Sequence, residues 1–326
     1  MLFQATHRTC ATVISAITCC SSAFGYVPIH SSFLPRTEIA VTHARPAAIL
    51  AADSTAKTYD LKMSYTNVVD TPETYTVEGK RSAARQISKD GSIVSRGSKY
   101  LEVNMRLVET PSQVSDGKVI KSKIVVASAK GRSKGDEPMK TLACQGATLA
   151  VTRLPKLSFA RADGKEISPT DQELLSMAIS PHDPKEAPID DLFGPGKNVR
   201  IGDTWQPSKD KMNAYYGSMF EMPAKDLDTS AKLVGSDTVN SKPCLLVSVD
   251  VTAKSLKTKA NSALRNVSGT LNLHLDQYVS PKPDELPLRS HLQEAATIRG
   301  TMEAAEGTMQ IISGTEQTID IVFLKP

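Results

Sequence analysis

Apolar and polar residues alternate with a period of two along several stretches of the chain. The clearest stretch runs from Leu101 to Leu107, where every second residue is apolar and the residues between are polar. Similar alternation covers residues 59–65, 245–251, 271–275 and 319–323. Successive side chains of a strand point to opposite faces of a sheet, so the pattern predicts strands with one buried face. Strands of this kind are typical of antiparallel sheets.

Turn signals separate the alternating stretches. Asp-Gly pairs stand at 90–91, 116–117 and 163–164, and Glu306–Gly307 gives a further signal near the end. Short alternating runs between such turns predict hairpins. We therefore expect a mainly β protein, built as large curved antiparallel sheets or a partly open barrel with one or two helices. The runs have no fixed spacing, which argues against solenoids and propellers.

One segment has the pattern of a helix. Ser168 can cap it, Pro169 suits its first position, and Asp171 stands three residues after the cap. An apolar stripe follows over residues 174–179, and Pro181 ends the segment. A second, weaker helical pattern covers Ser255 to Leu264.

A proline-rich segment over residues 182–196 divides the chain near its middle. Each side carries several alternating stretches, and each ends in long ones. The pattern predicts two similar β-rich halves, residues 57–194 and 195–326, as one domain or two.

The N-terminus has the features of an export signal. Residues 10–25 are uncharged and largely apolar, follow a weakly basic start, and end in small residues suited to cleavage. The stretch is shorter than the roughly 20 residues that a membrane-spanning helix needs. We predict a signal peptide over residues 1–25, the alternative being a buried N-terminal helix. Residues 26–56 are rich in Pro, Ser, Ala and Thr and predict a flexible tether. The mature protein would then be periplasmic or extracellular.

Composition narrows the function without defining it. The chain has 326 residues, of which 40% are hydrophobic, enough for a sizeable core. The net charge is only +4, from 39 basic and 35 acidic residues, and aromatics make up 5%. This balance argues against a nucleic-acid partner.

The predicted cleavage site divides the five cysteines into two groups. Three lie within residues 1–25, which leaves Cys144 and Cys244 in the mature chain. Disulfides persist in an oxidising compartment, so a bridge between these two is one hypothesis. The other is two separate buried thiols, since free cysteine behaves as a small hydrophobe.

One basic stretch has no acidic residue close to it in the sequence. It comprises Lys254, Lys257, Lys259 and Arg265. Lysine on an exposed sheet edge prevents edge-to-edge association, which gives a purely structural interpretation. The alternative is peripheral contact with an anionic surface, to which each basic residue adds about 1 kcal/mol.

A family resemblance enters at residues 196–205, which end in Gly202-Asp203-Thr204-Trp205. This segment, after a Pro/Gly-rich loop and before an alternating half, resembles a group of exported bacterial proteins of unknown function. That group is distantly similar to the periplasmic lipoprotein-carrier fold, so the resemblance implies a curved antiparallel sheet partly closed around a helix. Trp205 is a large apolar residue with one N–H to satisfy, and serves either as a packing anchor or as a ligand contact.

No catalytic motif is recognisable. A nucleophile elbow, a phosphate loop, a dinucleotide fingerprint and a zinc-protease motif are all absent from the sequence. We therefore expect no enzyme, cofactor or metal site. The sequence favours an exported envelope protein that binds a hydrophobic ligand or lipid in a curved sheet. The alternative is a structural or interaction protein of the envelope, with a protein partner and no small-molecule ligand.

Overall fold

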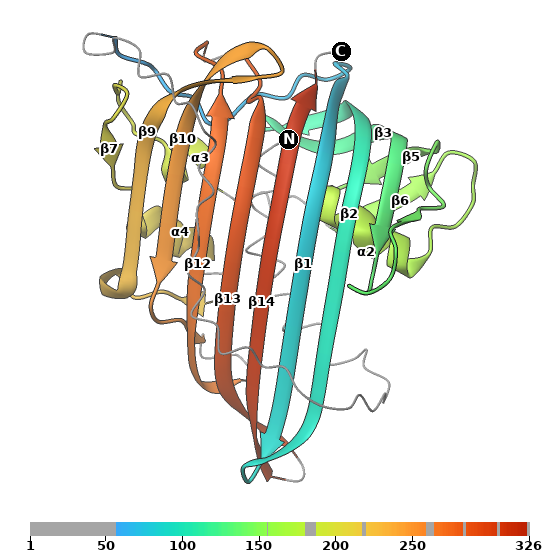
Figure 1. Cartoon of the computed structure of the whole chain (residues 1–326), viewed down its shortest axis with the longest axis vertical. Helices are drawn as coiled ribbons and strands as arrows, with labels where there is room; N and C mark the ends of the chain where they lie inside the picture. The colour runs from blue at the N-terminus through green and yellow to red at the C-terminus, as the bar shows by residue number, and fades with distance from the viewer. Residues whose placement is uncertain are drawn as a thin grey trace.

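The computed structural model describes residues 57–154, 156–179, 187–216, 220–258, 264–282, 285–304 and 307–324. The predicted signal peptide and tether lie outside these residues. The described chain is mainly β, as the alternation predicts, and its dominant element is one curved, 12-stranded sheet (Figure 1). All neighbouring strands in that sheet are antiparallel.

The first half of the chain supplies one side of the sheet. Its strands follow one another outwards from the centre in the order β1, β2, β3, β5, β6, and β4 pairs with β3. Their bounds are Glu73–Lys89 (β1), Ser92–Ser115 (β2), Lys118–Arg132 (β3), Lys140–Thr141 (β4), Thr148–Thr152 (β5) and Ser158–Arg161 (β6).

The second half supplies the other side, in the order β14, β13, β12, β10, β9, β7 from the centre outwards. Its strands are Thr204–Trp205 (β7), Leu227–Val239 (β9), Lys242–Ala253 (β10), Arg265–Val279 (β12), Arg289–Ala304 (β13) and Gly307–Leu324 (β14). Strands β8 (Phe220–Glu221) and β11 (Lys257–Thr258) form a separate small sheet. The halves meet where β1 pairs with β14, so the sheet is continuous, and its end strands β6 and β7 do not pair with each other.

Two of the predicted hairpin turns are confirmed, whereas Asp163–Gly164 leads from β6 towards α2 and Glu306 lies outside the described residues. Asp90–Gly91 joins β1 to β2 and Asp116–Gly117 joins β2 to β3, with φ values of 49° and 78° in the first turn and 51° and 72° in the second. Two successive positive φ angles define the tight turn that matches strand twist, and Asp-Gly adopts it readily. Asn240–Ser241, with φ values of 50° and 62°, makes a similar turn between β9 and β10, although this pair contains no glycine to signal a turn in the sequence.

The predicted helix is also confirmed, as α2 (Pro169–Ala178). The Ser168 hydroxyl accepts a hydrogen bond from the Asp171 backbone N–H, with the nitrogen and oxygen 3.0 Å apart. The buried face of α2 packs closely on the sheet. A Cβ atom at Gly131 would lie 2.9 Å from a Leu174 methyl carbon, so a glycine at this position permits the close approach of helix and strand.

The cap makes a direct prediction. Ser168→Ala leaves the Asp171 N–H without its acceptor and should lower the free energy of unfolding by about 0.5–2 kcal/mol. Thr170→Ala, in the exposed first turn of the same helix, is the matched control and should cost nothing. Urea unfolding of both variants checks this, and equal stability of the Ser168 variant and the wild type would remove Ser168 from the capping role.

Two predicted elements are wrong. Residues 59–65 do not form a ladder strand, and only an isolated bridge joins Tyr59 to Val199. The alternation is real, because Leu61 and Met63 are buried, but side chains rather than a neighbouring strand bond the backbone at Met63 and Ser64. Asp190 accepts from the Met63 N–H at 2.7 Å, and the Gln277 amide donates to the Met63 carbonyl at 2.8 Å. The helix expected at 255–264 is contradicted by β11, although residues 259–263 lie outside the described range.

Two helices fall where the sequence gave little indication of them. α3 (Ile189–Phe193) lies within the proline-rich segment 182–196, and α4 (Lys209–Tyr216) follows β7. Asp190, on α3, therefore fixes the segment around Met63 against the second half of the sheet.

Candidate ligand-binding face of the sheet

The two faces of the sheet differ in what covers them. We call the face that packs against α2 and α3 the inner face and the opposite one the outer face. In β1 and β14 the odd-numbered residues point inwards over much of their length, as the burial of Tyr75, Val77, Ile319 and Ile321 shows. In Figure 1 the helices lie behind the sheet, on its inner side.

Two apolar clusters occupy the inner face. The first apolar cluster joins α2 to β1, β2, β3, β5 and the C-terminal end of β14. The second joins α3 to β9, β10, β12 and β13, and includes Leu61 and Met63. The clusters divide between β13 and β14, near the middle of the sheet.

Three polar side chains cross this division in one row. The strand register places Glu294 of β13 beside Gln317 of β14, and Gln317 beside Arg81 of β1. All three are buried, and only 9% of Arg81 is exposed. The Arg81 Nε donates to the Gln317 side-chain oxygen at 2.6 Å. We call these three residues the central polar row.

The central polar row contains unused hydrogen-bonding capacity. Within the described part of the chain, the buried Arg81 Nη2 and the neighbouring Thr315 Oγ1 have no hydrogen-bond partner. Burial lowers the pKa of Arg81 to about 10, although the carboxylates of Glu294 and Glu173 favour its charged form. Buried polar groups in folded proteins are almost always hydrogen-bonded, so a polar group placed beside these atoms would be favourable. An Nη2 donor is suited to an acceptor oxygen.

A second buried polar group lies on the inner face at the other end of β1 and β2. Arg153 pairs with Glu109 at 2.6 Å, with both side chains almost fully buried. Tyr75 donates to Glu109 at 3.0 Å, and Arg153 donates to Ser122 at 2.9 Å. Glu73 lies opposite Glu109 in the strand register. One arginine therefore lies close to two carboxyl groups.

Of these two carboxyl groups, Glu73 has fewer hydrogen bonds than Glu109. Both of its carboxyl oxygens are buried without a hydrogen-bond partner in the described residues. Burial, together with the Glu109 carboxylate, raises the pKa of Glu73 to about 6. A carboxyl pKa that is raised on folding stabilises the protein below the unfolded pKa, and this stability is lost as pH rises through the folded value.

Glu73→Gln should therefore remove the part of the pH dependence of the free energy of unfolding that comes from this carboxyl group. Relative to the wild type, we expect a gain of about 2 kcal/mol at pH 8 and no gain at pH 4, since one pKa unit corresponds to about 1.4 kcal/mol. Urea unfolding at both pH values measures the difference. Glu78→Gln, on the outer face of the same strand, is the control, and an E73Q variant with the wild-type pH profile would contradict this prediction.

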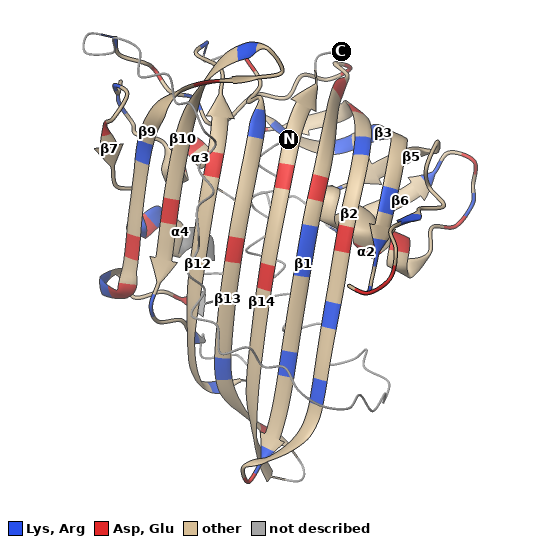
Figure 2. Ribbon diagram, viewed as in Figure 1, with Lys and Arg blue, Asp and Glu red and all other residues tan. Residues whose placement is uncertain are grey.

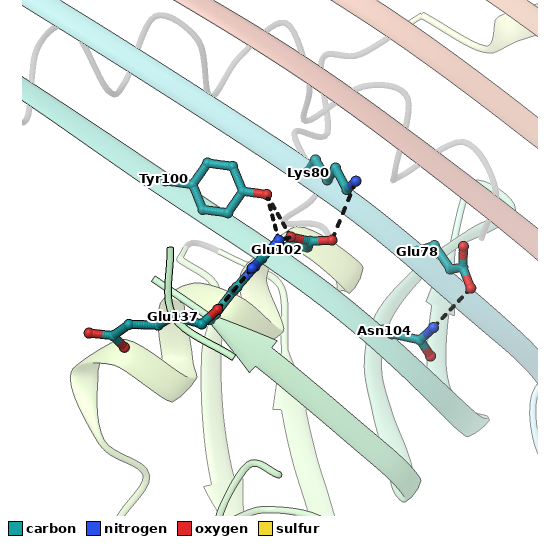
Figure 3. A network of polar contacts seen from close by, with 7 residues as sticks. Glu78, Lys80, Tyr100, Glu102, Asn104 and Glu137 are labelled. Carbon is teal, nitrogen blue, oxygen red and sulfur yellow. Dashed lines mark hydrogen bonds and ion pairs between the residues drawn. The ribbon is translucent and has the colours of Figure 1, made fainter. Parts of the chain in front are cut away.

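Charged residues are distributed over the outer face (Figure 2), which also carries a small third apolar cluster of Cys244, Leu246, Tyr278 and Leu288 on β10, β12 and the residue before β13. Glu102 on β2 contacts Arg132 at 2.5 Å and Lys80 at 3.5 Å, and accepts from Tyr100 at 2.5 Å (Figure 3). Hydrogen bonding from Tyr100 and Arg132, among other interactions, holds the pKa of Glu102 below its usual range despite an opposing effect of burial. These contacts cross three neighbouring strands and account for the charges there without a ligand.

Trp205 lies at the edge of the second apolar cluster. Its ring packs against the cluster, and its Nε1–H donates to the Phe193 carbonyl at 2.7 Å. Trp205 also pairs with Ala231 in the short β7–β9 ladder. The indole N–H therefore already has a hydrogen-bond acceptor within the protein. This supports the role of Trp205 as a packing anchor rather than as a ligand contact.

The hypothesis of a disulfide between Cys144 and Cys244 is wrong for this structure, in which both are free, buried thiols. Cys144 lies beside β3 in the first apolar cluster, whereas Cys244 is on β10. Six strand spacings of about 4.8 Å separate β3 from β10, or roughly 29 Å along the sheet. A disulfide requires Cα atoms within about 7 Å.

The predicted basic stretch is dispersed. Lys254 is paired with Asp228 at 2.6 Å, an acidic residue that lies far from it in the sequence. Lys257 lies on β11 opposite Glu221, and Lys259 lies outside the described residues. Arg265 is exposed at the start of β12, some distance along the chain from the others.

Over the described ranges, no three His, Cys, Asp or Glu side chains are grouped so that they could hold a metal ion. The same residues include no helix with the length and apolar character needed to cross a membrane.

Comparisons with known proteins do not assign a family. No family model matches the chain, and no curated protein matches it. A structure described as lipid–protein interactions in lipovitellin aligns with 78% of this chain at 8% identity and a TM-score of 0.29; the chain spans 25% of that protein's length. DynF from the dynemicin biosynthesis pathway of Micromonospora chersina aligns with 83% of this chain and 92% of its own, at 10% identity and a TM-score of 0.15. At these TM-scores, neither structure indicates a function for this chain.

Proposed function

We propose that this protein is a non-catalytic, exported envelope protein that binds an amphipathic, lipid-like ligand on the inner face of its sheet. One observation carries the proposal. Arg81 is buried between two apolar clusters, with its Nη2 lacking a hydrogen-bond partner in the described chain. A buried guanidinium is costly unless its donors are used.

The chemistry of the ligand follows from its surroundings. The acceptor oxygens of an acidic or phosphate head group would satisfy Arg81, and the Thr315 hydroxyl provides a second polar contact nearby. Hydrocarbon chains would lie against the apolar clusters on either side, where burial of apolar area stabilises binding. The central polar row thus fixes the head group, and the clusters provide the remaining affinity.

Export is supported by the sequence. The uncharged stretch over residues 10–25 and the small residues that end it have the pattern of a cleaved signal. A lipid-binding protein of the envelope would act where its ligands occur, at or between membranes.

Two neighbouring residues of β13 provide a matched test. Ala296 points to the inner face beside Thr315, whereas Ala295 points to the outer face beside Glu316. Ala296→Leu places extra volume beside the proposed head-group position, and Ala295→Leu adds the same volume on the opposite face. Binding is measured by titration with a fluorescent long-chain fatty acid and by displacement with oleate or phosphatidylglycerol.

We expect saturable binding to the wild type and to A295L, and at least tenfold weaker binding to A296L. A thermal melt of each variant establishes that it is folded. Absence of saturable binding to the wild type, or equal binding to both variants, would overturn the proposal. The structural alternative, an envelope protein without a small-molecule ligand, would then be favoured.

A further inference from the structure

Five strands extend the sheet into a narrow end beyond its helices. β12, β13, β14, β1 and β2 continue downwards in Figure 1, and the turn at Asp90–Gly91 lies at this end. We define the narrow end as residues 85–97, 265–270, 298–304 and 307–313.

The narrow end carries an exposed apolar pair. Ile93 and Val94 are 45% and 49% exposed, and they are adjacent at the start of β2. A register shift between Ile87 and Ser88 interrupts the β1–β2 ladder at this point. Neighbouring large apolar side chains in water are unfavourable, and they mark surfaces that contact another apolar phase.

Three arginines lie on the outer face of the narrow end, in the rows of residues that cross its strands. The register aligns Arg96 of β2 with Gln86, Ile312 and Arg299 across the four central strands. The adjacent row aligns Ile93 with Ser88, Gln310, Thr301 and Arg265. Arg96, Arg299 and Arg265 are all exposed.

The charge of the narrow end is positive as a whole. Its described residues include five basic side chains, Arg85, Lys89, Arg96, Arg265 and Arg299, and two acidic ones, Asp90 and Glu303. Basic side chains around an exposed apolar tip complement an anionic membrane, which offers phosphate charges at its surface and hydrocarbon beneath it.

We propose that the narrow end docks on the surface of an anionic phospholipid bilayer, with Ile93 and Val94 entering the interface and Arg96, Arg299 and Arg265 contacting head groups. This site is separate from the inner-face ligand site. It would bring the inner face close to a source of lipid, but it does not depend on the ligand proposal.

Vesicle sedimentation tests the docking site with the full chain. Vesicles of pure phosphatidylcholine are compared with vesicles of phosphatidylcholine and phosphatidylglycerol. One variant is Ile93→Ser with Val94→Ser, and another is Arg96→Gln with Arg299→Gln. The matched control is Val68→Ser with Val69→Ser. These valines are 51% and 44% exposed, and Asp70, beside them, hydrogen-bonds to Pro111 near the opposite end of β2.

We expect the wild type and the Val68/Val69 variant to bind anionic vesicles equally and neutral vesicles poorly. The arginine variant should bind about 25-fold more weakly, as two residues each contribute roughly fivefold. The apolar variant should lose about tenfold, and added salt should weaken wild-type binding. Equal binding to both vesicle types would overturn the proposal, as would an equal loss in the control variant. Tight binding of a soluble polyanion such as heparin, unchanged in the apolar variant and without vesicle binding, would instead indicate an anionic polymer as partner.

Discussion

Arg153→Met is expected to lower the free energy of unfolding by about 3–5 kcal/mol, the usual cost of removing one partner of a buried ion pair. Arg153 and Glu109 are both almost inaccessible to solvent and lie 2.6 Å apart. Without Arg153, the Glu109 carboxylate would remain buried close to Glu73, with the Tyr75 hydroxyl as a neutral donor. Urea unfolding at neutral pH measures the loss.

The double variant Arg153→Met with Glu109→Met separates the pair from its surroundings. Replacing a whole buried ion pair by apolar residues is often neutral or stabilising. We therefore expect the double variant to recover most of the stability that the single variant loses. A single variant that costs less than about 1 kcal/mol would show that the pair is not buried as described.

Arg81→Met is expected to weaken binding of an acidic lipid by about 10- to 100-fold, since hydrogen bonds to charged groups contribute about 1.5–3 kcal/mol. Methionine retains much of the apolar length of arginine but none of its donors. Binding of a neutral apolar probe without a head group should change little, because the apolar clusters remain. The same titrations, with oleate and with a neutral hydrocarbon probe, distinguish the two effects.

Arg106→Met is the control, because Arg106 is exposed on the outer face of β2. It should leave both affinities unchanged. An equal loss for the acidic lipid and the neutral probe in R81M would indicate a general disturbance of the inner face. That result would remove Arg81 from the head-group role.

The sheet itself could be predicted because alternation and turn chemistry are local signals. Leu101–Leu107 lies within β2, and the Asp-Gly turns fall between the expected strands. Ser168 and Asp171 likewise interact within one helical turn.

Segment 59–65 shows where such local signals give a wrong prediction. Leu61 and Met63 are buried, but the backbone of Met63 bonds to the side chains of Asp190 and Gln277, which lie far away in the sequence.

The central polar row could not be predicted from the sequence, because it depends on the pairing of strands that are far apart in the chain. Arg81 contacts Gln317 only because the first and last strands of the sheet pair. A local signal was nevertheless present, since Arg81 follows Tyr75, Val77 and Gly79 at inward-pointing positions of β1. A charged residue in the buried series of a strand indicates either an ion pair or a ligand contact. The sequence-level interpretations of Cys144 and Trp205 lacked the same long-range information.

The most direct test of the central claim is mass spectrometry of an organic extract of the protein purified from its native envelope. The inner-face site predicts a lipid-like molecule with an acidic or phosphate head group in the wild-type extract, near one per chain. The R81M extract should be strongly depleted of that molecule, and the R106M extract should match the wild type. A wild-type extract without such a molecule, or with equal amounts in R81M, would contradict the proposed ligand site.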